Sequence, residues 1–330
     1  LVGDILDSCS LSFDSTMEEI ETIKAEVLKI FDSKRLDVKE KEVTKRLNQI
    51  PTQGSKPINN DVVVGFEDEA TSIINRLTRG SRHVQIVPIV GMPGLGKTAL
   101  AKKVYNDSSI MSYFYTRAWC TVSQVYVVKN LLLEILTCIE SKHSERIFEM
   151  SEEDLAAEVK KRLLRTRYLI VFDDVWDMEV WNRLEASFPN DGNGSRVIMT
   201  SRLRDVVPQD NLHQEPHYLR QLTHDESWDL LKEKLCPGKD LLPSELSELR
   251  MQIVEMCQGL PLTIVILAGI LANMDPSGWK GEVQSLSSRN VSSTDQCTTA
   301  LELSYEHLPD NLQPCFLYFV GFLEDHEHTV

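Results

Sequence analysis

The segment GMPGLGKT, residues 91–98, has the residue types and the spacing that phosphate binding requires. It matches the pattern G-x-x-x-x-G-K-[ST] at Gly91, Gly96, Lys97 and Thr98, between an apolar run and a stretch with helical spacing. The glycines permit backbone conformations in which successive N–H groups point at phosphate oxygens, and a helix beginning near Lys97 would add the positive end of its dipole. Lys97 would place its charge on the β and γ phosphates, and the Thr98 hydroxyl would ligate Mg²⁺.

This loop predicts a site for a purine nucleoside diphosphate or triphosphate together with Mg²⁺. The residues in the loop and at its edge that we expect to contact the nucleotide are Gly91, Pro93, Gly94, Leu95, Gly96, Lys97, Thr98 and Ala99. The alternative is a glycine turn without a ligand. The strand expected before the loop and the helix expected after it count against that alternative.

A pair of acids further along the chain supports a metal-dependent site. Residues 168–172 form a continuous apolar run that is followed by Asp173 and Asp174. A strand ending in this way places carboxylates at the edge of a sheet where nucleotide sites hold their metal ion. We expect Asp173 to ligate Mg²⁺ and Asp174 to orient or activate the attacking water, with Lys97 as the second catalytic residue. An acidic turn after a buried strand is the alternative.

These motifs lie in a pattern of alternating strands and helices. Short apolar runs occur at residues 84–90, 118–122, 168–172 and 196–200. Because stretches with helical spacing separate them, the fold class predicted for about residues 60–220 is α/β, with a parallel sheet flanked by helices. Beyond residue 222 the strands stop, and helices are expected at 223–235, 244–257, 262–272 and 298–305.

The N-terminal part has a different pattern. Ser15 and Glu18 have capping-box spacing at the start of an amphipathic helix expected over 15–31, and a second helix is expected within 36–50. A segment rich in proline, glycine and asparagine follows, which predicts a domain boundary near residue 58. Because the first residue is leucine and no secretory signal pattern is present, the chain is expected to be a piece of a longer protein.

Composition excludes several classes of protein. The 330 residues are 42% hydrophobic, enough for a substantial core, and the formal net charge of −15 opposes binding to nucleic acid. The seven cysteines are scattered without a C-x-x-C pair, which indicates reduced thiols and no zinc site. The most apolar stretch, residues 260–272, is too short to cross a bilayer, so no transmembrane segment is expected.

Seven ordered motifs resemble one family, the nucleotide-binding adaptor (NB-ARC) domain of plant intracellular immune receptors of the coiled-coil type, which the apoptotic protease activating factors share. The motifs cover about residues 60–326. They are VVVGFEDE at 62–69, GMPGLGKT at 91–98, FYTRAWCTVSQ at 114–124, YLIVFDDVW at 168–176, GSRVIMTSR at 194–202, CQGLPL at 257–262 and CFLYFVGF at 315–322.

The resemblance adds residues to the expected site. Val63, Val64 and Gly65 resemble the family's segment along the adenine ring, and Arg202 is similar to its sensor arginine for the terminal phosphate. Pro261, with Leu262 beside it, resembles the proline that contacts the base from a helical lid. A capping role alone is the alternative for Pro261, because proline suits the first turn of a helix.

Three other positions and one absent motif need comment. Trp119 and Trp176 lie in family motifs and are interpreted as core aromatics. Phe66 stands where many relatives carry arginine, which puts in doubt an ion contact there. The chain contains no Met-His-Asp triplet, the motif whose histidine contacts the β phosphate of ADP in this family.

The resemblance implies four segments: a helical N-terminal segment and linker at 1–58, a P-loop nucleotide-binding domain at 59–220, a small all-α domain at 221–293 and the start of a winged-helix domain at 294–330. It also implies a switch in which ADP holds the α/β and helical domains closed, ATP favours an open form that oligomerises, and slow ATP hydrolysis resets the resting state. The expected output is defence signalling and the hypersensitive response.

Two other functions stay open from the residues: an AAA-like motor ATPase with continuous turnover, and a nucleotide-binding scaffold without hydrolysis. The implied partners are other domains of the same receptor, an N-terminal coiled coil and C-terminal leucine-rich repeats. The implied location is the cytoplasm, with peripheral attachment to membranes through regions outside this chain.

Overall fold

A computed structural model describes residues 63–124, 126–139, 145–203, 215–238, 243–288, 296–309 and 312–318. The helices expected at 15–31 and 36–50, the boundary near 58, and the end of the motif at 315–322 lie outside these residues. The sheet and the helices that surround the predicted site belong to one compact unit, Gly54–Ser304.

A five-stranded sheet forms the centre of this unit. In chain order its strands are β1 (Gln85–Val90), β2 (Thr116–Thr121), β3 (Tyr168–Val175), β4 (Arg196–Ser201) and β5 (His217–Tyr218). They are arranged β2-β3-β4-β1-β5, and every neighbouring pair is parallel. The parallel α/β fold predicted from the alternating pattern is therefore confirmed. β5, which has only two residues, was not predicted.

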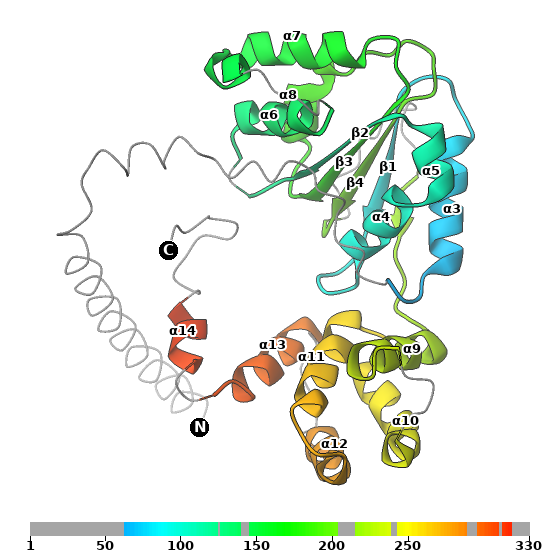
Figure 1. Cartoon of the computed structure of the whole chain (residues 1–330), viewed down its shortest axis with the longest axis vertical. Coiled ribbons are helices and arrows are strands. Elements are labelled where there is room, and N and C mark those ends of the chain that lie inside the picture. Colours follow the sequence, from blue (N-terminus) through cyan, green and yellow to red (C-terminus); the bar gives the residue numbers. More distant parts are fainter. Residues whose placement is uncertain are drawn as a thin grey trace, which may run out of the picture. The chain divides into compact units, whose positions relative to one another are not determined.

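Helices cover both faces of the sheet (Figure 1). They are α3 (Glu67–Thr78), α4 (Lys97–Tyr105) and α5 (Ser108–Tyr113) on one face, and α6 (Val128–Ile139), α7 (Glu152–Leu163) and α8 (Glu179–Leu184) on the other. An apolar core lies on each face: the first core is on the side of α3, α4 and α5, and the second is on the side of α6, α7 and α8. Successive strand residues point to opposite faces, so in β3 Leu169 and Val171 belong to the first core, and Ile170 and Phe172 belong to the second. Burial on both faces explains why these strands are continuous apolar runs.

After β5, the described residues form only helices and turns. The helices are α9 (His224–Leu235), α10 (Ser244–Cys257), α11 (Pro261–Ala272), α12 (Trp279–Ser288), α13 (Gln296–Glu306) and α14 (Gln313–Tyr318). The helices expected at 223–235, 244–257, 262–272 and 298–305 are confirmed to within two residues at each end. α12 was not predicted, although Trp279, Val283 and Leu286 are buried at helical spacing and signal its inner face.

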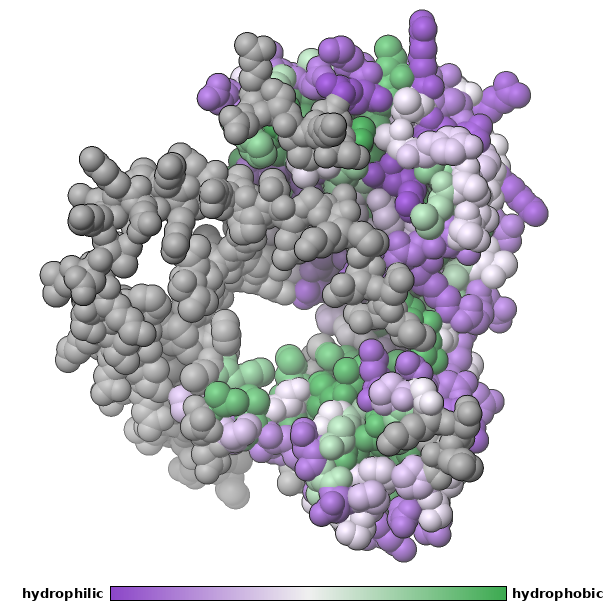
Figure 2. Space-filling view, in the orientation of Figure 1, coloured by the Kyte–Doolittle hydropathy of each residue, from purple (hydrophilic) through white to green (hydrophobic). Residues whose placement is uncertain are grey.

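The first core continues from the sheet into these helices. Leu231 of α9, Leu249 of α10 and Leu267 of α11 are buried in the same apolar cluster as Val87 of β1 and Leu100 of α4. On the face shown in Figure 2, hydrophobic residues gather around α11 and α13, while the α/β part is mainly hydrophilic. No helix among the described residues is both long and apolar enough to cross a membrane.

Gly259 lies where the loop before α11 contacts the segment before α9. Its carbonyl accepts a hydrogen bond of 2.9 Å from the Leu222 N–H, its φ is +73°, and a Cβ added to it would lie 2.4 Å from the Leu222 carbonyl oxygen. Because this clash is with backbone, Gly259→Ala should lower the free energy of unfolding by about 2–5 kcal/mol in urea denaturation.

Gly269→Ala is the matched control for this prediction. Gly269 lies inside α11, and a Cβ there would meet nothing within 4 Å. It should leave stability unchanged or raise it by about 1 kcal/mol, because alanine is a better helix former. Equal effects of the two substitutions would contradict the role of the contact between Gly259 and Leu222.

Candidate functional site

The phosphate loop joins the end of β1 to the start of α4. Gly94 and Gly96 have φ values of +74° and +94°, in the region that favours glycine, and Gly96 is the N-cap of α4. Because glycine has no side chain with which to cap the helix, the first N–H groups of α4 are left for an acceptor from outside. The loop therefore has the backbone geometry of an anion site.

Lys97 lies across this loop. Its Nζ donates hydrogen bonds to the carbonyls of Gly91, at 2.8 Å, and Met92, at 3.0 Å, and the residue is only 7% exposed. These carbonyls compensate for the cost of burying the ammonium group. The cation is thereby held beside the backbone N–H groups, where a bound phosphate would meet its charge.

Thr98 and Asp173 lie side by side at the edge of the sheet. Oδ1 of Asp173 accepts hydrogen bonds from the hydroxyls of Thr98, at 3.0 Å, and Thr200, at 2.5 Å. Burial raises the pKa of the Asp173 carboxyl, while the two hydroxyl donors act in the opposite direction. One carboxylate and one hydroxyl oxygen fit Mg²⁺, which prefers oxygen ligands and takes its remaining ones from water and substrate phosphates.

Asp174 has a different partner from its neighbour. The Asp174 carboxylate forms an ion pair with Arg202, whose Nη2 lies 3.0 Å from Oδ2. The backbone φ of Asp174 is +59°. The guanidinium of Arg202 also lies 4.6 Å from the centre of the Trp176 ring. Trp176 is only half-buried under this arginine, so its interpretation as a core aromatic was wrong. Trp119 contacts the first core from a partly buried position.

The lid expected from the resemblance lies directly against the phosphate loop. The N–H of Leu262, in the first turn of α11, donates a hydrogen bond of 3.2 Å to the Gly94 carbonyl. A Cβ on Gly96 would lie 3.7 Å from the Pro261 ring and 3.3 Å from the buried ring of Phe66. Pro261 is the first residue of α11, after the N-cap Leu260, so one proline both begins the helix and lies near the loop.

One cavity of about 1070 Å³ collects most of the predicted residues. Of those, its walls contain Val63, Val64, Pro93, Gly94, Gly96, Lys97, Thr98, Ala99, Asp173, Asp174, Arg202, Pro261 and Leu262. Gly65, Gly91 and Leu95 do not line it. Gly65 and Leu95 are buried, and a Cβ on Gly91 would meet Leu95 at 2.9 Å, so these three residues lie behind the residues that line the cavity.

The cavity also has walls that the motifs did not predict. These are Phe66, Lys102, Lys103, Asn106, Thr121, Leu230, Lys234 and Val265. With Lys97 and Arg202, the cavity thus has five cationic side chains and only two carboxylates, in a chain whose net charge is −15. Such a local excess of positive charge favours an anionic ligand. The basic residues after Thr98 in the same helix were the available signal for Lys102 and Lys103.

Comparison with known proteins identifies a family. A family model described as "NB-ARC domain" matches residues 66–241. The chain is 40% identical over 271 residues to "Putative late blight resistance protein homolog R1B-14" of Solanum demissum, covering 82% of this chain and 20% of that protein. It is 36% identical over 332 residues to the homolog R1B-8 of the same plant, covering 95% and 27%.

The chain thus spans only 20% and 27% of the length of these two relatives. Among solved structures, it resembles "Structure of the Aeropyrum Pernix ORC2 protein (ADPNP-ADP complexes)" with a TM-score of 0.50 at 14% identity. That similarity covers 70% of this chain and 69% of the other, and it concerns the fold.

Proposed function

Because this chain belongs to the NB-ARC domain family, we propose that it is the nucleotide switch of a plant immune receptor, one that binds ADP or ATP with Mg²⁺. The observation that carries the proposal is the convergence on one cavity of the phosphate loop, the acids in the last part of β3, Arg202 after β4 and Pro261 at the start of α11. Parallel strands present their carboxyl ends at one edge of the sheet, where α/β proteins bind their ligands.

Each part of the cavity has a role in this proposal. The loop N–H groups and Lys97 hold the phosphates, and Thr98 with Asp173 would hold Mg²⁺, whose charge would stabilise the phosphate oxygens. Asp174 would orient the attacking water. The strip Val63–Gly65 and Pro261 would enclose the base, since Val63, Val64 and Pro261 line the same cavity.

A switch needs contacts that differ between its two states. The hydrogen bond from Leu262 to Gly94 and the proximity of Pro261 to the loop are contacts of this kind, because opening of the helical part would break them. The Arg202–Asp174 pair is another, since a terminal phosphate would compete with Asp174 for the guanidinium. We propose that ADP favours the closed form and ATP the open one, with slow hydrolysis between them.

The wider role is inferred from the relatives, which are named as late blight resistance protein homologs. We propose that the switch controls defence signalling within a longer receptor. The other receptor domains, a coiled coil and leucine-rich repeats, would be its partners, with self-association on activation. We also propose the division into segments 1–58, 59–220, 221–293 and 294–330, and a cytoplasmic location with peripheral membrane attachment through other regions.

The direct test is to denature freshly purified protein, identify any released nucleotide by chromatography, and measure ATP turnover. We expect close to one ADP per chain and turnover well below about 1 per second. Faster steady turnover would favour the motor ATPase, and bound ADP that never exchanges with added ATP would favour the scaffold. Absence of any bound nucleotide, with no binding of added ADP or ATP, would reject the proposal.

A further inference from the structure

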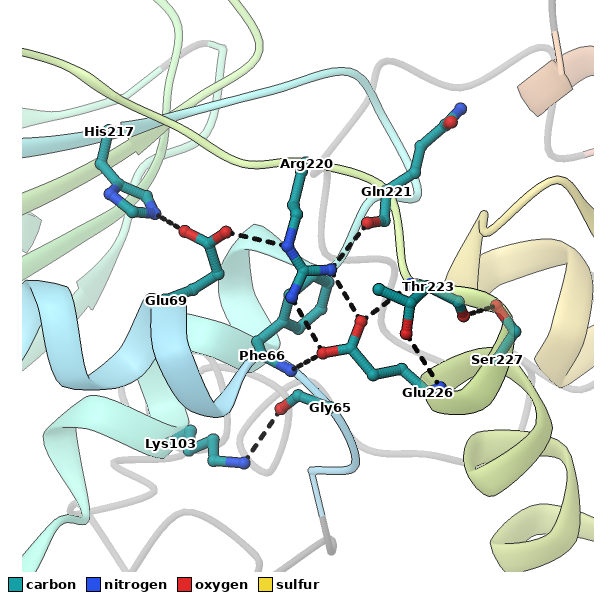
Figure 3. Close-up of polar contacts among 10 residues, drawn as sticks. All are labelled: Gly65, Phe66, Glu69, Lys103, His217, Arg220, Gln221, Thr223, Glu226 and Ser227. Atoms are coloured by element: carbon teal, nitrogen blue, oxygen red, sulfur yellow. Dashed lines mark hydrogen bonds and ion pairs between the residues drawn. The ribbon is translucent and has the colours of Figure 1, made fainter.

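A polar cluster connects α3, β5 and α9, the point at which the sheet-containing part of the chain continues into helices (Figure 3). Arg220 lies at its centre. Its Nη1 and Nη2 donate to the two carboxylate oxygens of Glu226, at 2.7 and 2.9 Å, and its Nε lies 3.1 Å from Oε1 of Glu69. Such a bidentate pair fixes both the position and the orientation of the carboxylate.

Glu226 uses the same oxygens to hold the backbone on two sides. It belongs to the capping box of α9, in which its Oε2 accepts a hydrogen bond of 2.8 Å from the Thr223 N–H. Its Oε1 accepts one of 3.1 Å from the N–H of Phe66, 160 residues away in the sequence. The carboxylate thus links the start of α9 to the residue that directly follows the strip Val63–Gly65.

The strip is held from its other side by α4. Nζ of Lys103 donates to the carbonyls of Val63, at 3.2 Å, and Gly65, at 3.0 Å. Gly65 also packs against α9, since a Cβ there would lie 3.4 Å from Cβ of Glu226. A cation from α4 and a carboxylate from α9 therefore determine together where the strip lies.

We propose that Arg220 and Glu226 are positioning residues for the base end of the nucleotide cavity, because they hold the strip Val63–Gly65 in place through the Phe66 N–H. This inference rests on the proposed nucleotide site. The pair also makes the strip depend on α9. When α9 moves away, the Phe66 N–H loses its acceptor on Glu226, and the strip is no longer held in position to contact the base. Within the described part of the chain, the hydrogen bonds of the pair do not reach the phosphate loop, so phosphate binding is left intact.

Comparing a ligand that has a base with one that has only phosphates distinguishes this positioning role from a general structural role. Arg220→Gln keeps the capping box of α9, because Thr223 and Glu226 remain. We expect isothermal calorimetry on the whole chain with Mg²⁺ to show a dissociation constant for ADP that is raised roughly tenfold, equivalent to about 1.4 kcal/mol. The dissociation constant for inorganic pyrophosphate, which lacks a base, should stay unchanged.

Two further variants sharpen the test. Arg250→Gln is the matched control: Arg250 of α10 pairs with the exposed Asp225 of α9, the helix that also carries Glu226, and lies over the ring of Trp228. Because neither partner belongs to the strip, both affinities should stay at wild-type values. Glu226→Gln should also weaken ADP selectively, and the double variant with Arg220→Gln should be no worse than Arg220→Gln alone, because both act through one contact.

Unchanged ADP affinity in Arg220→Gln would overturn the inference, and so would equal losses for ADP and pyrophosphate. Either result would leave the proposed function standing, provided that the wild type binds ADP. A wild type that binds neither ligand would reject the proposed function and, with it, this inference. If Arg220→Gln does not fold, Glu226→Gln gives the same comparison, because its single amide oxygen cannot accept from the N–H groups of Phe66 and Thr223 as the two carboxylate oxygens do.

Discussion

Purified Lys97→Ala is expected to contain no bound nucleotide, whereas the wild type retains it. The buried ammonium of Lys97 donates to the carbonyls of Gly91 and Met92, and we propose it as the loop's cation for the phosphates. Removing one partner of a buried, hydrogen-bonded charge pair costs about 2–5 kcal/mol, so the dissociation constant of ADP should rise at least ~30-fold. Chromatography of the nucleotide released on denaturation measures retention, and calorimetry measures the affinity.

Lys161→Ala is the control for this substitution, because its side chain is 73% exposed on α7 and pairs with Glu158 of the same helix. It should retain nucleotide as the wild type does. Circular dichroism of Lys97→Ala shows whether the fold survives the loss of the two carbonyl contacts. Wild-type nucleotide content in a folded Lys97→Ala protein would remove Lys97 from the site.

Changing the two acids in the last part of β3 should separate nucleotide binding from turnover. Asp173→Ala removes the expected metal ligand and leaves the hydroxyls of Thr98 and Thr200 without their shared acceptor, so Mg²⁺-dependent binding of ATP should weaken. Asp174→Ala should spare binding and lower hydrolysis by about 10²–10⁴-fold, the usual contribution of a positioned acid or base.

Nucleotide affinity with and without Mg²⁺, combined with single-turnover hydrolysis, distinguishes the two roles. Asp173→Asn serves as a second variant, because its amide oxygen still accepts hydrogen bonds from the two threonines and so preserves their packing. Equal loss of binding in Asp173→Ala and Asp174→Ala would reject the division of roles. Loss of binding in Asp174→Ala alone would assign the metal to that residue.

Local sequence was enough to predict the parts of the site that depend on neighbouring residues. The phosphate loop is eight contiguous residues, and its glycines and the helix after it determine the backbone geometry. The apolar run before Asp173 and Asp174 was likewise correctly predicted as a strand, and the two acids lie in the last part of that strand, β3. Continuous apolar runs located most strands and patterns of period 3.6 located most helices for the same reason, since both reflect burial along one element.

Contacts between distant elements could not be read in this way. Asp174 and Arg202, 28 residues apart, were assigned separate roles, and they form an ion pair because β3 and β4 are adjacent in the sheet. Arg196 was expected only as the start of a strand, but it is 1% exposed and donates to carbonyls that include those of Arg79 and Ser81. Strand order, not the local pattern, brings these groups together.

The sequence by itself therefore determined the fold class and the local structure around the phosphate loop and the two acids of β3, because each depends on residues that are close along the chain. Only the tertiary structure decided that α11 lies on the loop through Leu262, and that Glu226 reaches the backbone of Phe66. These contacts depend on how α9 and α11 continue the core that begins at the sheet. The positions of α11 and of the strip Val63–Gly65 are set by that shared core, since burial of apolar side chains has no preference for residues near in sequence.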